Sequence, residues 1–244
     1  MDTGCCLYSR PHHQRILSLL QNMDGNLLQE TQCYFGGGTA IVLSLCEYRE
    51  SDDIDFMCAS EEGYRVLRNI AFDKGLAGFF SHSPRQIRDL KSDRYGIRTF
   101  VEVDGVAIKM EIVREDRISL SGELNPVWGV PVLSQTDMYA EKLLANADRF
   151  ADASTASRDI IDLAMMIREW GPIPDEAWTK VKNPYGESVE KSFAKACQLI
   201  EKPDYLASCL KKMHMDSCWL DRILAALGIE MKIPEDDHFL VPRS

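Results

Sequence analysis

The sequence predicts an α/β (α+β) protein in which a mixed sheet with flanking helices is followed by a helical domain. Runs with strand-like alternation lie in the first half of the chain, around a glycine-rich turn. After the stretch 122–131, which holds two glycines and two prolines, the apolar spacing becomes that of helices. We therefore predict two domains, at residues 1–125 and 126–244.

Helices and strands alternate along the start of the chain. They are predicted as a helix at 12–31, a strand at 32–35, a helix at 39–46, a strand at 53–56 and a helix at 61–74. The helices follow from apolar positions three and four residues apart, and Gly75 is a typical residue to end the last of them. The polar stretch 81–94 has no clear pattern and is left unassigned.

A β-hairpin is predicted where two strand-like runs, 95–103 and 106–113, are joined by Asp104 and Gly105. Asp-Gly is a typical two-residue turn between antiparallel strands. The second run carries its apolar side chains at alternate positions, so Glu111 points away from the apolar row.

The second domain is predicted to be helical throughout. Its helices are expected at 135–150, 156–170, 175–182, 187–200, 205–213 and 217–227.

Composition limits the location and the partners of the protein. With 28 Lys and Arg against 38 Asp and Glu, the net charge is −10, which argues against broad binding to nucleic acid. Any contact with nucleic acid is therefore expected to be confined to one local basic cleft. No stretch approaches the length of a membrane-spanning helix, so we expect no membrane contact. The eight cysteines lack C-x-x-C spacing, which is typical of free thiols in a cytoplasmic protein.

The glycine turn and the acidic strand behind it carry the clearest chemical signal. Gly37, Gly38 and Thr39 open a predicted helix, where a close backbone approach and free amides favour a nucleotide phosphate. Asp53 and Asp55 alternate in a strand, so both carboxylates point the same way and repel unless a cation lies between them. Mg²⁺ prefers such ligands. A solvated strand edge is the alternative, but the order of turn, helix and acidic strand favours metal-dependent nucleotidyl transfer.

Three further residues have two interpretations each. Glu111 is a third carboxylate if its strand neighbours Asp53 and Asp55, or it is a cross-strand partner of Arg98. Lys142 grips phosphate oxygens, or it lies on a solvated helix face. Asp159 has no obvious local partner and is expected to face a cleft.

Near Asp159, Arg158 and Asp162 are four residues apart and could form a local pair on one helix. In the last third of the chain, Cys209, His214 and Cys218 could suggest zinc, but their helical surroundings favour ordinary core or surface roles.

The sequence resembles the AbiEii/AbiGii-type nucleotidyltransferase toxins, a branch of the DNA polymerase β-like nucleotidyltransferases. Four segments carry the resemblance in the family's order. They are Gly-Gly-Thr-Ala at 37–40 with Tyr-Arg-Glu-Ser-Asp-Asp-Ile-Asp-Phe at 48–56, Lys-Met-Glu at 109–111, Thr-Asp-Met-Tyr-Ala-Glu-Lys-Leu-Leu at 136–144, and Arg-Asp-Ile-Ile-Asp-Leu at 158–163. The family more often has Asp at the position of Glu111.

The resemblance implies a nucleotidyltransferase catalytic domain and a helical domain that contributes to the nucleotide site. It implies Asp53 and Asp55 as metal ligands, Glu111 as the third carboxylate, Lys142 as a phosphate contact and Asp159 as an active-site acid or base.

The implied reaction is Mg²⁺-dependent transfer of a nucleoside monophosphate from an NTP to an acceptor. RNA such as tRNA is the acceptor that the resemblance suggests, in a toxin–antitoxin setting with a cognate antitoxin as partner. The alternatives are modification of a small molecule or of a protein hydroxyl, and a binding scaffold that has lost catalysis.

Overall fold

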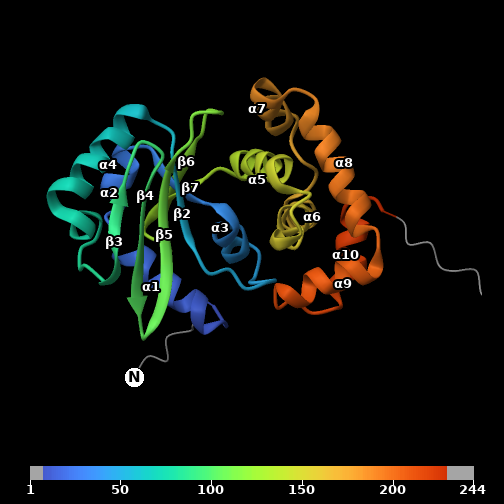
Figure 1. Ribbon diagram of the computed structural model, residues 1–244, viewed down its shortest axis with the longest axis horizontal. Coiled ribbons are helices and arrows are strands. Elements are labelled where there is room, and N and C mark those ends of the chain that lie inside the picture. Colours follow the sequence, from blue (N-terminus) through green and yellow to red (C-terminus); the bar gives the residue numbers. More distant parts are fainter. Residues whose placement is uncertain (1–7, 230–244) are drawn as a thin grey trace, which may run out of the picture.

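A computed structural model describes residues 8–229, and in this range a seven-stranded mixed sheet is flanked by ten α-helices (Figure 1). The strands are β1 Cys33–Gly36, β2 Ile54–Cys58, β3 Arg85–Ser92, β4 Gly96–Val103, β5 Val106–Arg114, β6 Gly122–Asn125 and β7 Val130–Leu133. Their order across the sheet is β3-β4-β5-β2-β1-β7-β6. Strand β5 runs parallel to β2 and β7 runs parallel to β1, whereas the other neighbours are antiparallel. The predicted α/β class is confirmed.

The helices cover the sheet and then form a separate layer. They are α1 Pro11–Asn22, α2 Gly25–Glu30, α3 Gly37–Ser44, α4 Glu61–Lys74, α5 Gln135–Arg149, α6 Arg158–Trp170, α7 Asp175–Tyr185, α8 Ser188–Ile200, α9 Pro203–Lys212 and α10 Trp219–Ala226. Every helix predicted after residue 135 is present to within a few residues. Helix α4 has the predicted bounds and ends at Gly75, and the hydroxyl of Ser60 caps its start.

The helix predicted over 12–31 is wrong in one respect, because it is two helices. Helix α1 ends at Asn22, and Met23 makes an isolated bridge to Phe80. The Asp24 carboxylate then accepts from the amide of Leu27 at 3.0 Å and caps α2. Such a side-chain cap competes with helix continuation, and the apolar spacing does not reveal it.

The sheet is larger than predicted, because strands form in segments that lack a strand-like pattern. The unassigned stretch contains β3, an edge strand that is almost entirely exposed and therefore shows no apolar alternation. The Gly- and Pro-rich stretch contains the hairpin β6–β7, in which Gly129 adopts a φ of 72°. The sheet thus continues to Leu133, past the predicted division between residues 125 and 126, and the existence of two independent domains stays a prediction.

The predicted β4–β5 hairpin is confirmed with its register. Asp104 and Gly105 have φ values of 50° and 76°, the positive values that this tight turn requires. Arg98 lies directly opposite Glu111, as closing the hairpin at this turn demands. The hairpin thereby places every second side chain of both strands on one open face of the sheet.

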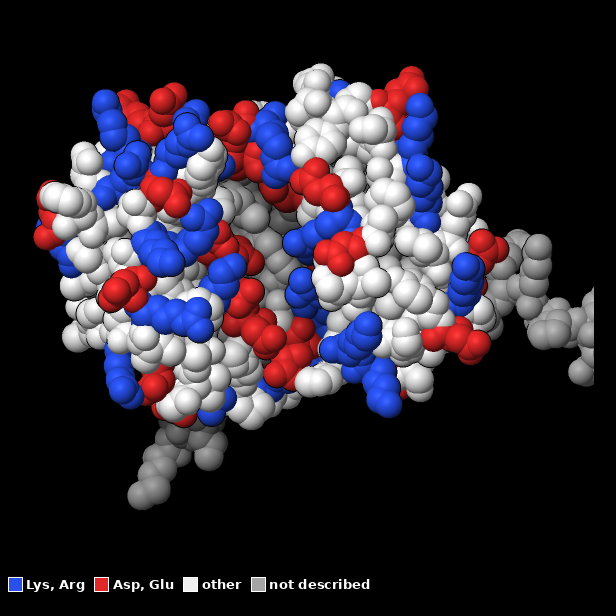
Figure 2. All heavy atoms as spheres, viewed as in Figure 1, with Lys and Arg blue, Asp and Glu red and all other residues white. Residues whose placement is uncertain are grey.

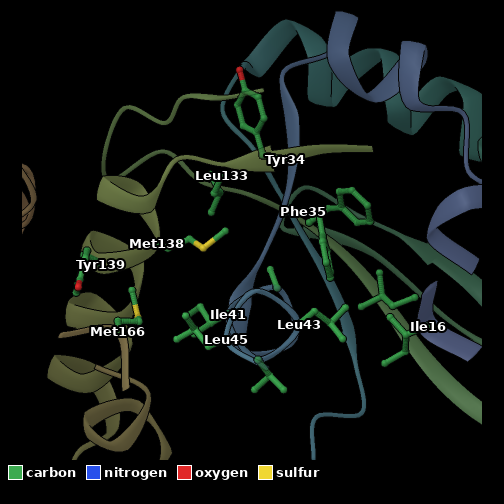
Figure 3. Close-up of a cluster of buried hydrophobic side chains, with 14 of the residues drawn as sticks. Ile16, Tyr34, Phe35, Ile41, Leu43, Leu45, Leu133, Met138, Tyr139 and Met166 are labelled. Atoms are coloured by element: carbon green, nitrogen blue, oxygen red, sulfur yellow. The ribbon is translucent and has the colours of Figure 1, made fainter. Parts of the chain in front are cut away.

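Helix α3 lies between the sheet and the helical layer (Figure 3). Its residues 39–43 are all buried, because one side packs on β1 and β2 and the other on α5 and α6. Leu133, Met138 and Met166 approach it from β7, α5 and α6. A helix that is apolar on all sides fits such an enclosed position. One hydrophobic core therefore connects the two halves of the chain.

None of the described helices combines the length and the apolar character that a membrane span requires. The described cysteines are free thiols, as expected, and they are Cys33, Cys46, Cys58, Cys197, Cys209 and Cys218.

Candidate active site

The two halves of the molecule meet across a groove with acidic side chains on one wall and basic side chains on the other (Figure 2). The groove holds a cavity of about 480 Å³. The sheet side contributes Asp53, Asp55 and Glu111 together with Lys109, and the helical side contributes Lys142, Arg149, Arg158 and Lys212. Such a division of charge suits an anionic ligand that is held beside a cation.

The glycine turn brings the start of α3 against the carboxylate of Asp55. Gly36 pairs with Asp55 across β1 and β2, and Gly37 has a φ of 68°, a value that favours glycine. A Cβ atom on Gly37 would lie 2.9 Å from Oδ2 of Asp55, and one on Gly38 would lie 2.5 Å from the guanidinium of Arg49. Side chains at these two positions would collide with Asp55 and with Arg49. Unpaired amides of the first helical turn therefore lie beside the carboxylates.

The side chain of Thr39 is buried and supports the loop in front of β2. Its hydroxyl donates to the carbonyl oxygen of Asp53 at 2.5 Å and shares a hydrogen bond of 2.8 Å with the hydroxyl of Ser51. Thr39 was predicted to bind nucleotide, but the turn lines the cavity through Gly38. In the structure the Thr39 hydroxyl holds the backbone of Asp53, and Thr39 as a nucleotide contact stays a prediction.

Asp53 and Asp55 face the groove on the same side of β2, as the alternation predicts. Ile54 and Phe56 point into the core. The alternative of a solvated strand edge is wrong, because β2 lies inside the sheet between β5 and β1. Neither carboxylate forms an ion pair with a described residue, and burial raises the pKa of both. For Asp55, burial and the charge of Asp53 raise the pKa to about 6.

Glu111 combines the two roles that the sequence left open. It lies beside Asp55 in the parallel pairing of β2 and β5, which is where a third carboxylate is expected. It also accepts hydrogen bonds from Arg98 across the hairpin and from Lys109 at 2.6 Å. Burial by itself would raise the pKa of Glu111, but Lys109 and Arg98 hold it below its usual value.

The fit of a divalent cation rests on two of the three carboxylates. In residues 8–229 no group of three or more His, Cys, Asp and Glu side chains is arranged to hold a metal ion. Glu111 is engaged by Arg98 and Lys109, whereas Asp53 and Asp55 offer hard oxygen ligands without a cationic partner in the described chain. Asp53 and Asp55 therefore fit a divalent cation, and Glu111 as a third ligand stays a prediction.

A buried ion-pair network supports the basic wall. Arg49 meets Asp162 through two hydrogen bonds of 2.8 and 2.9 Å, with side chains 3% and 0% exposed. Lys142 lies 2.8 Å from Asp162 and 3.0 Å from Asp159, and Arg149 closes the row at 2.7 Å from Asp159. Burial would raise the pKa of Asp162, but Arg49 and Lys142 hold it far below its usual range. Three cations facing two carboxylates leave one positive charge beside the cavity.

This network corrects three expectations. Lys142 does not lie on a solvated face, because it is buried between two carboxylates. Asp162 does not pair with Arg158, because Arg49 occupies both of its oxygens. Asp159 is buried and does not face the cleft, since Lys142 and Arg149 hold its oxygens. No helical spacing within α6 could reveal these partners, which come from other elements.

The rim of the cavity includes residues that the sequence did not single out. The amide of Glu50 donates to the carbonyl oxygen of Met213, and Nδ1 of His214 lies 3.1 Å from the Glu50 carboxylate. Arg10 contacts both Glu50 and the carbonyl oxygen of His214. These contacts join α1 and the loop before β2 to the end of α9. His214, which could suggest zinc, serves instead in this contact.

The sequence matches the family model described as nucleotidyl transferase AbiEii toxin, type IV TA system, over residues 19–208. The match covers the glycine turn, the acidic strand and the buried network. The chain belongs to the AbiEii family. The AbiEii resemblance inferred from four sequence segments is thus confirmed, and the site lies on a nucleotidyltransferase.

Three solved structures are similar to this chain, and the names of two of them contain the word nucleotidyltransferase. A nucleotidyltransferase candidate from H. pylori is 17% identical with a TM-score of 0.50, and the match covers 88% of this chain and 89% of that one. JHP933 from Helicobacter pylori is 19% identical with a TM-score of 0.49, covering 90% of each chain. An antigenic nucleotidyltransferase-like protein from Paracoccidioides brasiliensis is 16% identical with a TM-score of 0.49, covering 86% and 97%. No curated protein matches the chain.

The buried pair should dominate the stability of this AbiEii-family chain. We expect Arg49→Met to lower the free energy of unfolding by about 3 kcal/mol or more, because Asp162 loses its bidentate partner inside the protein. Arg65→Met is the matched control, since Arg65 forms an exposed pair with Glu62 that contributes at most about 1 kcal/mol. Urea unfolding followed by circular dichroism measures both. Equal effects would contradict the role of the network.

The raised pKa of Asp55 predicts how the stability of the folded protein changes with pH. The folded protein binds this proton more tightly than the unfolded chain, so ionisation of Asp55 destabilises the metal-free protein as pH rises from about 4 to about 6. Asp55→Asn should therefore increase the free energy of unfolding at about pH 7.5 by about 2–3 kcal/mol. The melting temperature should rise accordingly. The gain should shrink as the pH falls through this window.

The control for this experiment is Asp104→Asn in the hairpin turn, where Asn-Gly is equally suited and the side chain is exposed. A lower melting temperature for Asp55→Asn than for this control at neutral pH would contradict the electrostatic account.

Proposed function

We propose that the protein is an Mg²⁺-dependent nucleotidyltransferase that transfers a nucleoside monophosphate from an NTP to an acceptor hydroxyl. The observation that carries this proposal is the couple of Asp53 and Asp55, which has no ion-pair partner among residues 8–229 and lies beside the first turn of α3, opposite the basic wall. The hydroxyl oxygen forms the new bond to the α-phosphorus, and the bond to the leaving pyrophosphate breaks. A divalent cation bound there would neutralise phosphate charge and favour ionisation of the attacking hydroxyl.

Asp53 and Asp55 are the proposed metal ligands. Gly37 and Gly38 let the start of α3 pack closely against Asp55 and Arg49, and the amides of its first turn are proposed to attract the triphosphate. Thr39 acts by holding the Asp53 backbone.

The basic wall is proposed to receive the remaining phosphate charge. Lys142 and Arg149 are held in place by carboxylates, whereas Arg158 and Lys212 line the cavity from α6 and α9. Lys142 therefore serves as a phosphate contact whose position is set by Asp159 and Asp162. The resemblance implies Asp159 as an acid or base, but its bonds to two cations favour a positioning role. Burial would raise the pKa of Asp159, but the charge of Lys142 and a hydrogen bond from Arg149 keep it low.

RNA such as tRNA is proposed as the acceptor, with a cognate antitoxin as partner. The support is the family description, a toxin of a type IV toxin–antitoxin system. Neither aspartate has a cationic partner in the part of the chain that the structure describes, and this also favours an active enzyme over a scaffold that has lost catalysis. A cytoplasmic location remains an expectation of the proposal.

The function is tested by incubating the protein with each α-labelled NTP, Mg²⁺ and total cellular RNA, and by following label in RNA. Asp53→Asn should lower transfer by roughly two orders of magnitude or more, because one hard ligand is lost. Mg²⁺ should also raise the melting temperature of the wild type and not of this variant. Asp104→Asn should behave as wild type in both assays. Undiminished transfer by Asp53→Asn would refute the assignment.

Glu111 is proposed as the third carboxylate, and two substitutions separate this role from a structural one. Glu111→Gln should abolish transfer, while Glu111→Asp, the residue more usual in the family, should retain measurable activity. Glu102→Gln is the matched control, because Glu102 forms an exposed pair with Arg85 on the same sheet face and should keep the wild-type rate. If Glu111→Gln and wild type are equally active, Glu111 only pairs with Arg98 and Lys109, and stability should fall by about 1 kcal/mol or less per lost pair.

A further inference from the structure

Among the described residues, no element covers one face of the β4–β5 hairpin and of its neighbouring edge strand β3, beside the active-site cavity. In β4 and β5 the inward side chains are fully buried, among them Ile97, Ile108 and Ile112. The alternate side chains, such as Phe100 and Lys109, lie on the opposite face and are only partly covered. The pairing of β3 with β4 then sets Arg85 opposite Glu102 and Lys91 opposite Arg98.

This open face is basic although the protein is acidic. We name it the basic platform, and it consists of Arg85, Arg88, Lys91, Arg98, Phe100 and Lys109. On this face the five Lys and Arg outnumber two glutamates, Glu102 and Glu111, which pair with Arg85, Arg98 and Lys109, whereas the whole chain has a net charge of −10. Figure 2 shows the resulting basic side chains over β3 to β5, next to the groove. Local positive charge of this kind attracts a polyanion even when the net charge opposes it.

The platform is continuous with the active site. Lys109 and Glu111 line the cavity, and Arg98 binds Glu111 from the next strand. Because neighbouring strands lie about 4.8 Å apart, the platform extends about 14 Å from β2 to the edge strand β3. A chain bound along it would therefore end at Asp53 and Asp55.

Flat side chains on and beside the platform suit bases as well as phosphates. The guanidinium of Arg88 lies 4.3 Å from the centre of the Phe100 ring, and Arg94 lies 4.5 Å from the ring of Tyr95, which is 60% exposed. Single-stranded nucleic acid is held in this way by proteins that combine a basic track with stacking surfaces. Neither Arg88 nor Lys91 forms an ion pair with a described residue, so their charges remain available.

We propose that the basic platform binds a single-stranded nucleic acid and leads its end to Asp53 and Asp55. The inference deepens the proposed function. Delivery of the nucleic-acid end to Asp53 and Asp55 rests on that function, whereas binding at the platform does not, because it requires neither nucleotide nor metal. The competing explanation is that charges on β3 only protect an exposed sheet edge from pairing with other chains. An acidic protein could also bind a basic surface, but its binding would not require that the platform be continuous with the active-site cavity.

The test uses the full chain and a fluorescein-labelled, unstructured single-stranded RNA of about fifteen nucleotides, followed by anisotropy without NTP or Mg²⁺. A DNA of the same sequence shows whether the sugar matters. The triple variant Arg85→Gln, Arg88→Gln, Lys91→Gln should raise Kd roughly tenfold or more, and the slope of log K against log salt should fall by about 0.7 per lost phosphate contact.

The matched control is Lys191→Gln, Lys195→Gln, Lys202→Gln, which removes the same charge from exposed positions in the helical half. It should bind as wild type. Phe100→Leu should weaken binding without changing the salt slope, because it removes a stacking surface and no charge. All six side chains replaced in the two triple variants are exposed, so the substitutions leave the core intact. Unchanged melting temperatures are therefore expected.

Failure of the inference is distinguishable from failure of the proposed function. No RNA or DNA binding by the wild type, or equal loss in the two triple variants, overturns the platform and leaves transfer to a small molecule or protein hydroxyl standing. Binding that depends on the platform without label transfer to any RNA overturns the RNA acceptor alone. If both hold, the platform variant should raise KM for RNA and leave kcat and KM for NTP unchanged.

Discussion

The bidentate contact between Arg49 and Asp162 fixes how the two halves of the molecule meet. Arg49 lies in the loop before the acidic strand, and Asp162 lies on α6 in the helical half. Both charges are withdrawn from water, so an altered arrangement of the halves would leave one of them buried without a partner. The same carboxylate also holds Lys142 and the hydroxyl of Tyr48. The orientation of the basic wall therefore depends on a contact made within the core.

The site combines two opposite electrostatic conditions across one groove. On the sheet side, Asp53 and Asp55 stand close together in partial burial, and the raised pKa of each records that negative charge is unfavourable there. On the helical side, cations outnumber their buried carboxylates. A metal ion with a triphosphate would relieve both conditions, because the cation neutralises the aspartates and the phosphates meet the excess positive charge.

Strand order links the carboxylates of the candidate site to the surface beside them. Because β5 inserts next to β2 in parallel, Glu111 lies level with Asp55, and the rest of the hairpin continues outward as an uncovered face. The helices α1, α2 and α4 and the central helix α3 leave this face free (Figure 1). One sheet thus carries the proposed metal ligands Asp53 and Asp55 on an inner strand and the basic platform at its edge.

The sequence by itself determined the features that depend on short-range geometry. The period of two in β2 places Asp53 and Asp55 on one side, the Asp104–Gly105 turn sets Arg98 opposite Glu111, and the helices after residue 135 follow from their apolar spacing.

Only the tertiary structure decided which charges are buried and what they meet. Arg49 and Asp162 are 113 residues apart, and nothing in the local pattern of either segment indicates the other. Strand β3 and the β6–β7 hairpin likewise depend on partners supplied by the rest of the sheet. The physical reason is that periodicity reports one face of one element, whereas ion pairing and strand order depend on contacts between distant segments.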